Sequence, residues 1–195
     1  AADGPGRPPD GPSAGASVGL ADAAGAVRAL ERLRDTPLWD RMQVTVIGDG
    51  KHFGLFEEAF ADDANVTVER RFAVQEEIAA LHREHGVFLV PTRLDSQGVS
   101  RDEAMASGLV PVTNDAGAVR EFVDKDCAMI ADAEDVAGLA DGLRRLMEDP
   151  DLFLRMSRAA AARVRAQTSP EHTVDQEMAL MGLAAGPGGR GEENA

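Results

Sequence analysis

Two carboxylates, Asp95 and Glu103, are separated by seven residues, with Gly98 between them. We expect Asp95 in the loop after a buried strand and Glu103 on the helix that follows. A helix that begins near Gly98 directs free backbone N–H groups and the positive end of its dipole at a phosphate or a sugar oxygen. A carboxylate accepts two hydrogen bonds at once, which suits the hydroxyls of a sugar or ribose. In isolation, the same pair also fits a helix cap followed by a solvated acid.

Apolar runs alternate with amphipathic stretches along the chain. The strands are expected at residues 43–50, 65–71, 86–91, 109–113 and 127–131. The helices are expected at residues 23–34, 53–61, 74–85, 101–107, 117–123, 134–148 and 151–167. This alternation predicts βαβ crossovers and therefore a parallel sheet. We predict an α/β, Rossmann-like, three-layer domain with five or six parallel strands and helices on both faces.

Polar residues gather where the expected strands end, and the strands themselves are apolar. The segments concerned are 48–51, 70–73, 91–98 and 113–117. Ligands of open parallel sheets bind outside the carboxyl ends of the strands. We therefore expect these four segments to converge on a ligand.

Composition divides the chain into three parts. Gly, Pro, Ala and Ser dominate residues 1–19, and the last ten residues have a similar composition. Such stretches bury too little apolar surface to fold alone. We predict a disordered tail at 1–19, a Rossmann-like domain at 20–168, and a C-terminal helix with a disordered tail at 169–195.

The charge and the apolar runs exclude several classes of protein. A net charge of −14 leaves no basic stripe of the kind that nucleic acid requires. No apolar run reaches the length of about 18 residues that suggests a membrane span, and the N-terminus does not resemble a signal peptide. We expect a cytoplasmic, bacterial protein, with peripheral attachment to a membrane left open.

Cysteine and histidine suggest neither disulfides nor metal. The single cysteine, Cys127, lies among apolar residues and is expected to be a small core residue. His82 and His85 are three residues apart on one expected helix, where a solvated helix face is favoured over a zinc site. We therefore expect no metal ion.

The stretch around the two carboxylates resembles the family 4 (group 1) glycosyltransferases, which have the GT-B fold. The family hallmark is Glu-x7-Glu followed by Ala-Met-Ala, a glycine and a Pro-Val strand. The matching residues here are Asp95-x7-Glu103, Ala104-Met105-Ala106, Gly108 and Pro111-Val112. The resemblance covers about residues 44–165 and includes VTVIGDGK, RRFAVQEEIAALHREHGVFLVPT and NDAGAVREFVD.

The resemblance implies the C-terminal, donor-binding half of a GT-B enzyme. It assigns Asp95, Gly98 and Val99 to the donor sugar and Glu103 to the ribose, with Asp95 and Glu103 as the catalytic pair. Asp95 is one methylene shorter than the usual glutamate. Phe72 would border the base, although it also fits an ordinary core aromatic. The full donor-binding set is Gly48, Asp49, Gly50, Phe72, Ala73, Gly98, Val99, Ser100 and Glu103.

The implied function is to bind a nucleoside-diphosphate sugar for retaining, metal-independent hexosyl transfer. The nucleotide sugar is the substrate, and no cofactor is expected. The family's first loop carries an Arg and a Lys that neutralise the departing pyrophosphate. Here no Arg follows Gly19 and no Lys precedes Gly25, so two developing charges lack a partner. We expect this chain alone to be inactive, and an N-terminal acceptor domain or a partner chain to complete the site.

Two other interpretations remain open from the sequence. The chain could be a truncated or degenerate module that binds a nucleotide or a partner chain without catalysis. It could also be a different Rossmann-like protein, such as a sugar-nucleotide epimerase or a receiver-type domain.

Overall fold

The computed structural model describes residues 14–94, 97–168, 174, 177–179 and 181. Its strands are β1 (Ala14–Val18), β2 (Met42–Gly48), β3 (Val66–Arg70), β4 (Val87–Leu89), β5 (Val110–Asn114) and β6 (Met129–Ala131). Its helices are α1 (Ala23–Arg34), the 3-10 helix η1 (Trp39–Arg41), α2 (Gly54–Phe60), α3 (Gln75–Glu84), α4 (Val99–Ala106), α5 (Val119–Phe122), α6 (Val136–Glu148) and α7 (Pro150–Thr168).

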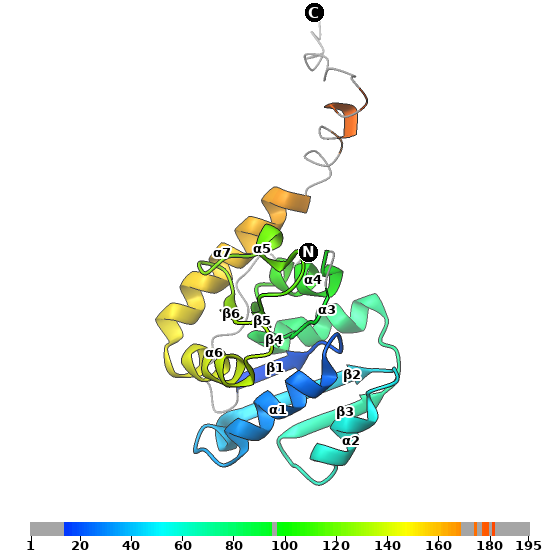
Figure 1. Ribbon diagram of the computed structural model, residues 1–195, viewed down its shortest axis with the longest axis vertical. Coiled ribbons are helices and arrows are strands. Elements are labelled where there is room, and N and C mark those ends of the chain that lie inside the picture. Colours follow the sequence, from blue (N-terminus) through cyan, green and yellow to red (C-terminus); the bar gives the residue numbers. More distant parts are fainter. Residues whose placement is uncertain (1–13, 95–96, 169–173, 175–176, 180, 182–195) are drawn as a thin grey trace, which may run out of the picture.

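The strands form one parallel sheet in the order β3-β2-β1-β4-β5-β6. The order reverses between β1 and β4, which is the switch point where such sheets open a crevice for ligands. Helices α1, α2 and α6 lie on one side of the sheet, and α3 and α4 lie on the other (Figure 1). The predicted α/β, Rossmann-like architecture with a parallel sheet and helices on both faces is therefore confirmed.

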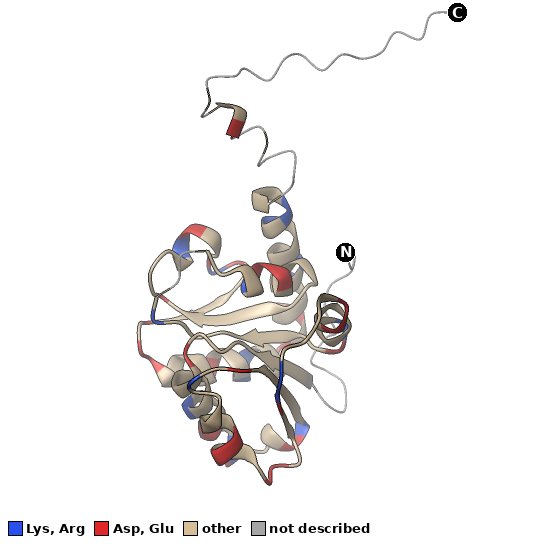
Figure 2. Ribbon diagram, turned by 90° about the vertical axis from the view of Figure 1, so that its right-hand side faces the viewer, with Lys and Arg blue, Asp and Glu red and all other residues tan. Residues whose placement is uncertain are grey.

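Successive side chains of a strand point to opposite sides of the sheet. Those that point towards α1, α2 and α6 form one continuous apolar cluster, here called the core face. It includes Ala16, Val44, Val46, Leu89 and Val112. Asp and Glu lie mostly on helices and loops outside the sheet, whose inner strands are largely without charge (Figure 2). The apolar strand residues thus supply the core, and the acidic residues are left to the surface.

The other side of the sheet, here called the pocket face, carries polar as well as apolar side chains. Ser17, Thr45, Ile47 and Phe88 point this way, each next to a residue of the core face. Thr45 and Ile47 are only half-buried, because α3 makes few contacts with the sheet. Incomplete cover by α3 leaves room for a pocket on this face.

The predicted boundary of the N-terminal tail was wrong, because the tail of residues 1–19 contains strand β1. This strand pairs with both β2 and β4 and so lies in the middle of the sheet. Its residue Gly15 has no room for a side chain because the end of α3 lies close to it. A Cβ atom on Gly15 would lie 2.8 Å from the backbone oxygen of Glu84 and 2.9 Å from Cδ2 of His85. A strand selected for small size has the composition of a linker, which explains the error.

The expectation of a solvated face for the two helical histidines was also wrong. His82 and His85 are each 5% exposed. His85 contacts the backbone oxygen of Leu81 through Nδ1 at 2.7 Å and Oγ1 of Thr45 through Nε2 at 3.0 Å. The histidines form the part of α3 that faces the sheet, and the charged residues beside them face solvent.

Two further expectations can be compared with the structure. Cys127 is 1% exposed and packs in a second apolar cluster with Met105 and Val164, as predicted for a core residue. Burial raises the pKa of its thiol. Within the described part of the chain, no helix combines the length and apolarity needed to cross a membrane. The predicted C-terminal helix and tail at 169–195 fall largely outside the described residues.

Candidate functional site

A pocket of about 260 Å³ lies at the carboxyl ends of β1 and β2, between the pocket face and α3. We call it the edge pocket. Its lining is mainly apolar, with a few polar groups. It consists of Ser17, Val18, Gly19, Leu20, Thr45, Ile47, Gly48, Phe72, Ala73, Glu77, Ile78, Leu81, His82, Phe88, Ser100 and Glu103. An apolar cavity with a few convergent polar groups is the usual form of a small-molecule site.

The edge pocket brings together five of the residues predicted from the sequence. They are Gly48, Phe72, Ala73, Ser100 and Glu103. These residues come from β2, the loop after β3, and α4, so the expected convergence of segments at this edge is observed for them. Their contacts with a ligand stay a prediction.

Other predicted residues lie beside the pocket but do not line it. Asp49 accepts a hydrogen bond from the backbone N–H of Gly50 at 2.8 Å and lies 3.5 Å from Arg70. Gly98 forms the turn that precedes α4, and Val99 is 58% exposed. Asp95 lies outside the described residues, so its position relative to Glu103 stays a prediction.

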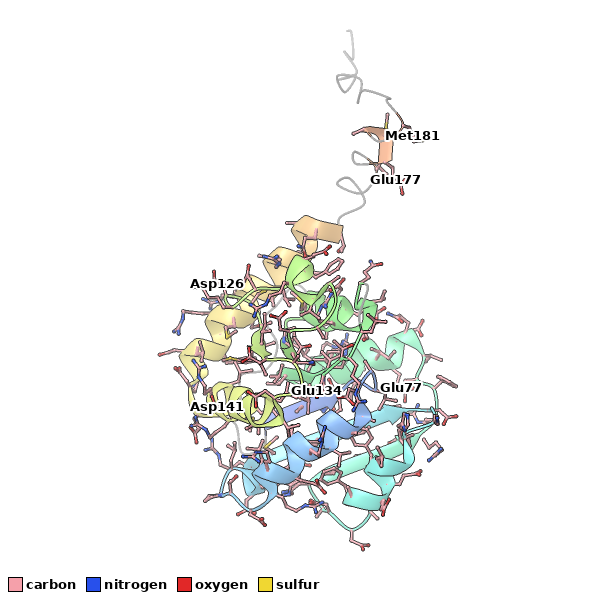
Figure 3. The ribbon with its side chains drawn as sticks, in the orientation of Figure 1. Glu77, Asp126, Glu134, Asp141, Glu177 and Met181 are labelled. Carbon is pink, nitrogen blue, oxygen red and sulfur yellow. The ribbon has the colours of Figure 1, made fainter. Side chains whose placement is uncertain are left out.

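Phe72 extends into solvent at the rim of the edge pocket and is 82% exposed. The alternative of an ordinary core aromatic is therefore excluded. The loop that carries it is held by Arg71, which donates to Glu69 at 2.6 Å and to Glu77 at 2.8 and 2.5 Å. These bonds raise the pKa of Arg71 and lower that of Glu77, which is labelled on α3 in Figure 3. The exposed ring thus stands on an anchored loop.

Glu103 is half-buried on α4 and, like Phe72, lines the edge pocket. Nε2 of Gln75, the first residue of α3, donates a hydrogen bond to Oε1 of Glu103 at 2.9 Å. The bond joins α3 to α4 beside the pocket. Because a carboxylate has further acceptor sites, Glu103 can also accept from a ligand hydroxyl.

Two polar residues that line the pocket, Ser17 and His82, were not identified from the sequence. Ser17 is 3% exposed, and its buried Oγ has no hydrogen-bond partner among the described residues. The His82 ring contacts Phe88 edge-on, with ring centroids 6.1 Å apart. Burial lowers the pKa of His82, and the nearby charge of Glu103 opposes that effect. The available signal was the alternation of Ser17 with Ala16, which requires that β1 first be recognised as a strand.

The loop after β4, which leads towards Gly98, is fixed by a buried amide. Oδ1 of Asn114, at the end of β5, accepts from the backbone N–H of Thr92 at 2.7 Å, and its Nδ2 donates to the backbone oxygen of Thr92 at 2.6 Å. Asn114 is 5% exposed. The start of the loop is therefore attached to a strand that is buried over its whole length.

Comparison with known proteins places the chain in a family. The model of the family described as "Glycosyl transferases group 1" matches residues 22–149, more than half of the chain. The chain belongs to the group 1 glycosyltransferases. It is 32% identical over 99 residues to the lipopolysaccharide core biosynthesis mannosyltransferase LpsB of Rhizobium meliloti (strain 1021), a match that covers 49% of this chain and 27% of that protein.

Solved glycosyltransferase structures share the fold of this group 1 member. The S. aureus TarM G117R mutant, solved with Fondaparinux, alpha-GlcNAc-glycerol and UDP, matches with a TM-score of 0.74 at 14% identity over 86% of this chain and 35% of its own. The apo lipopolysaccharide outer core galactosyltransferase WaaB matches with a TM-score of 0.72 at 14% identity over 91% of this chain and 51% of its own. The chain thus spans between about a quarter and half of the length of these proteins.

This glycosyltransferase chain departs from the family pattern where the donor phosphates are expected. Leu20 and Ala24 stand in place of the Arg and the Lys. Leu20 lies beside Gly48, and the nearby Asp22 forms an ion pair with Arg93, with Nε 3.4 Å from Oδ1. In the described part of the chain, no group of three or more His, Cys, Asp or Glu side chains is arranged to hold a metal ion. The nearby cation, Arg93, is therefore already paired with an acidic residue.

Proposed function

We propose that this domain binds the nucleotide of a nucleoside-diphosphate sugar in the edge pocket and serves as the donor half of a retaining hexosyltransferase. One observation carries the proposal: exposed Phe72 and half-buried Glu103 flank a single apolar pocket at the switch point of the sheet. An exposed aromatic ring suits stacking on a base. The Glu103 carboxylate, which lines the same pocket, suits the two ribose hydroxyls.

In this proposal the diphosphate and the sugar extend from the pocket towards the start of α4. The free N–H groups at the start of α4 donate hydrogen bonds to oxygens of the sugar. The bond from the anomeric carbon to the diphosphate breaks, and a bond from that carbon to an acceptor oxygen forms on the same face of the sugar. The proton of the acceptor hydroxyl passes to the departing diphosphate. Asp95 and Glu103 remain the proposed catalytic pair, with neither a metal ion nor a cofactor. Binding of the acceptor falls to an N-terminal domain or a partner chain.

Isothermal titration calorimetry tests the binding step on the chain as it stands. UDP, GDP and ADP are titrated first, followed by UDP-glucose, GDP-mannose and ADP-glucose. The proposal expects saturable, one-to-one binding of one nucleoside diphosphate and its sugar conjugate. If none of the six compounds binds, the proposed function is wrong.

The variant Glu103→Ala tests the assignment of the ribose. Loss of a charged hydrogen-bond acceptor should weaken nucleotide binding by about 1–3 kcal/mol. Glu58→Ala is the matched control, because Glu58 is an exposed glutamate on α2 away from the edge pocket. Equal affinities of the two variants would remove Glu103 from the site.

A second candidate is a non-catalytic module that binds a nucleotide or a partner chain. It is favoured by Leu20 and Ala24 at the positions of the family's cations, and by the pairing of Arg93 with Asp22. The double variant Leu20→Arg/Ala24→Lys restores the cations. We then compare sugar transfer by wild type and variant, each mixed with an acceptor domain from a related enzyme. Transfer in either mixture supports the enzyme, and its absence from both supports the binding module.

A further inference from the structure

Arg101 is the largest of the fully buried side chains, with only 1% of its surface exposed. It lies on α4 between Gly98 and Glu103, and the glycosyltransferase motif leaves it without a role. Burial of a guanidinium group is costly unless its donors are satisfied by well-placed partners. An arginine at such a position therefore implies that its partners require it.

The guanidinium of Arg101 connects three elements. Its Nη2 donates to the backbone oxygen of Gln97, in the loop before α4. Its Nε and Nη2 contact Oδ1 of Asp102, on α4, at 3.2 and 3.1 Å. The ring of Phe122, at the end of α5, lies 5.1 Å from its central carbon. Loop, helix and neighbouring helix thus meet at one side chain.

The bond to Gln97 acts on the turn that begins α4. Gly98 follows directly and has φ 74° and ψ 52°, a left-handed conformation that favours glycine. Gly98, the N-cap residue of α4, has no side chain that could cap the helix. The first N–H groups of a helix have no partner within the helix, and their direction follows the turn. A side chain that fixes the Gln97 carbonyl therefore fixes the direction of these N–H groups.

We propose that Arg101 is a positioning residue that locks the Gln97–Gly98 turn and thereby aims the start of α4 at the sugar of the donor. The proposal rests on the proposed function, because it is that function which places a sugar at the start of α4. Arginine suits the role because its planar fork can serve two acceptors while its face stacks on Phe122. Lysine keeps the charge without the fork, so Arg101→Lys should retain part of the effect.

Hydrogen exchange measured by mass spectrometry tests the lock without any ligand. We compare the wild type with Arg101→Met, Arg101→Lys and the control Arg155→Met, in which an exposed arginine of α7 is changed. Opening of the turn should speed exchange in peptides that cover residues 97–103 by about tenfold in Arg101→Met, less in Arg101→Lys and not at all in the control. Peptides from β5 should be unchanged. Unchanged exchange at 97–103 in Arg101→Met overturns the lock.

Calorimetry tests the link to the sugar. The measured quantity is the affinity of the sugar conjugate divided by that of the matching nucleoside diphosphate. Arg101→Met should reduce this ratio by about tenfold while the affinity for the nucleoside diphosphate stays within about twofold. An equal loss for both ligands would indicate a purely structural role and overturn the proposal.

Two controls keep these outcomes distinct. If Arg101→Met does not fold, Phe122→Leu serves as the second variant: it removes the stacked ring, leaves the arginine in place and should raise exchange at 97–103 above that of the wild type. No rise in that variant overturns the lock. If the wild type binds none of the nucleotides, the proposed function fails, and the exchange experiment still decides whether Arg101 locks the turn.

Discussion

The two faces of the sheet differ in how completely their side chains are packed. On the core face, the side chains from β1, β2, β4 and β5 interdigitate with α1, α2 and α6 in one continuous apolar cluster. On the pocket face, Ser17 has a buried hydroxyl without a described partner, and Thr45 and Ile47 are half-buried. The sheet is thus tightly packed on one side and, over β1 and β2, incompletely filled on the other, which is what a binding site requires.

The contrast is sharpest at the helices. The apolar residues of α6 recur at helical spacing and are buried, including Leu139, Leu143 and Leu146. On α3 the corresponding residues, Ile78 and Leu81, are half-buried and line the edge pocket. A helix that buries only part of its apolar stripe contributes less to stability and can adjust when a ligand binds.

The largest expected difference between the two faces is in the stability lost when a leucine is truncated to alanine. Leu143→Ala removes a fully buried side chain from the core face and should lower the free energy of unfolding by about 2–5 kcal/mol. Leu81→Ala, beside an existing cavity, should cost less than half as much as Leu143→Ala. Urea denaturation measures both values. Equal losses would show that the pocket face is packed as tightly as the core face.

Close contact between α3 and β1 gives the next largest effect. In Gly15→Ala the new Cβ would meet backbone and ring atoms at 2.8–3.0 Å, so we expect a loss of about 1–3 kcal/mol from overpacking. Gly54→Ala is the control, since the nearest atom lies 3.6 Å away on the flexible side chain of Arg70. Thermal unfolding compares the two variants. A Gly15→Ala protein as stable as the control would contradict the closeness of α3 to the strand.

The buried histidines of the pocket face make the free energy of unfolding depend on pH. Burial lowers the pKa of His85 from 6.5, although its contact with the Leu81 backbone and the charge of Glu84 oppose the shift. The unfolded chain therefore binds a proton more readily than the folded one, and stability falls as the pH drops below about 6.5. In His85→Gln the unfolding free energy, measured from about pH 5 to 8, should fall less steeply towards acid. The exposed His52→Gln should keep the slope of the wild type. Parallel curves for all three proteins would refute this origin of the dependence.

The smallest effect concerns the buried hydroxyl in the pocket. Ser17→Ala removes an unsatisfied polar group and should raise the unfolding free energy by up to about 1 kcal/mol. The same change should weaken nucleotide binding, because the hydroxyl faces the edge pocket. Chemical denaturation and calorimetry on one preparation measure both. A less stable Ser17→Ala protein would mean that the hydroxyl already has a partner.

The order of elements could be predicted because hydrophobic period and strand–helix alternation are local properties. The β-branched run of β2 and the apolar runs of β4 and β5 predict strands from the local sequence alone. Strand β1 did not, since Ala14–Val18 is short, contains Gly15 and follows a segment rich in Gly and Pro. Its Gly15 is explained by the end of the helix that packs on it, which is a tertiary constraint and leaves no local pattern.

The same distinction applies to the site. Glu103 could be proposed because it belongs to a motif with recognisable spacing, and Phe72 because its segment resembles a loop of the family. Ser17 and His82 could not, because they reach the pocket only through the side of the strand or helix on which they lie. The role of Arg101 likewise depends on Phe122, which is distant in sequence. Residues that act through tertiary neighbours can be identified only from the three-dimensional structure.

The amide of Asn114 allows the chain after β4 to separate from β5 at this edge of the sheet. One side chain supplies both an acceptor and a donor to Thr92, and so imitates a rung of the hydrogen-bond ladder after the two backbones have begun to separate. The chain can leave the sheet without leaving buried backbone polar groups unpaired at Thr92. An aspartate of nearly the same shape would set a second oxygen against the Thr92 carbonyl, so two acceptors would repel each other there. Strand separation in this fold therefore depends on the single nitrogen by which asparagine differs from aspartate.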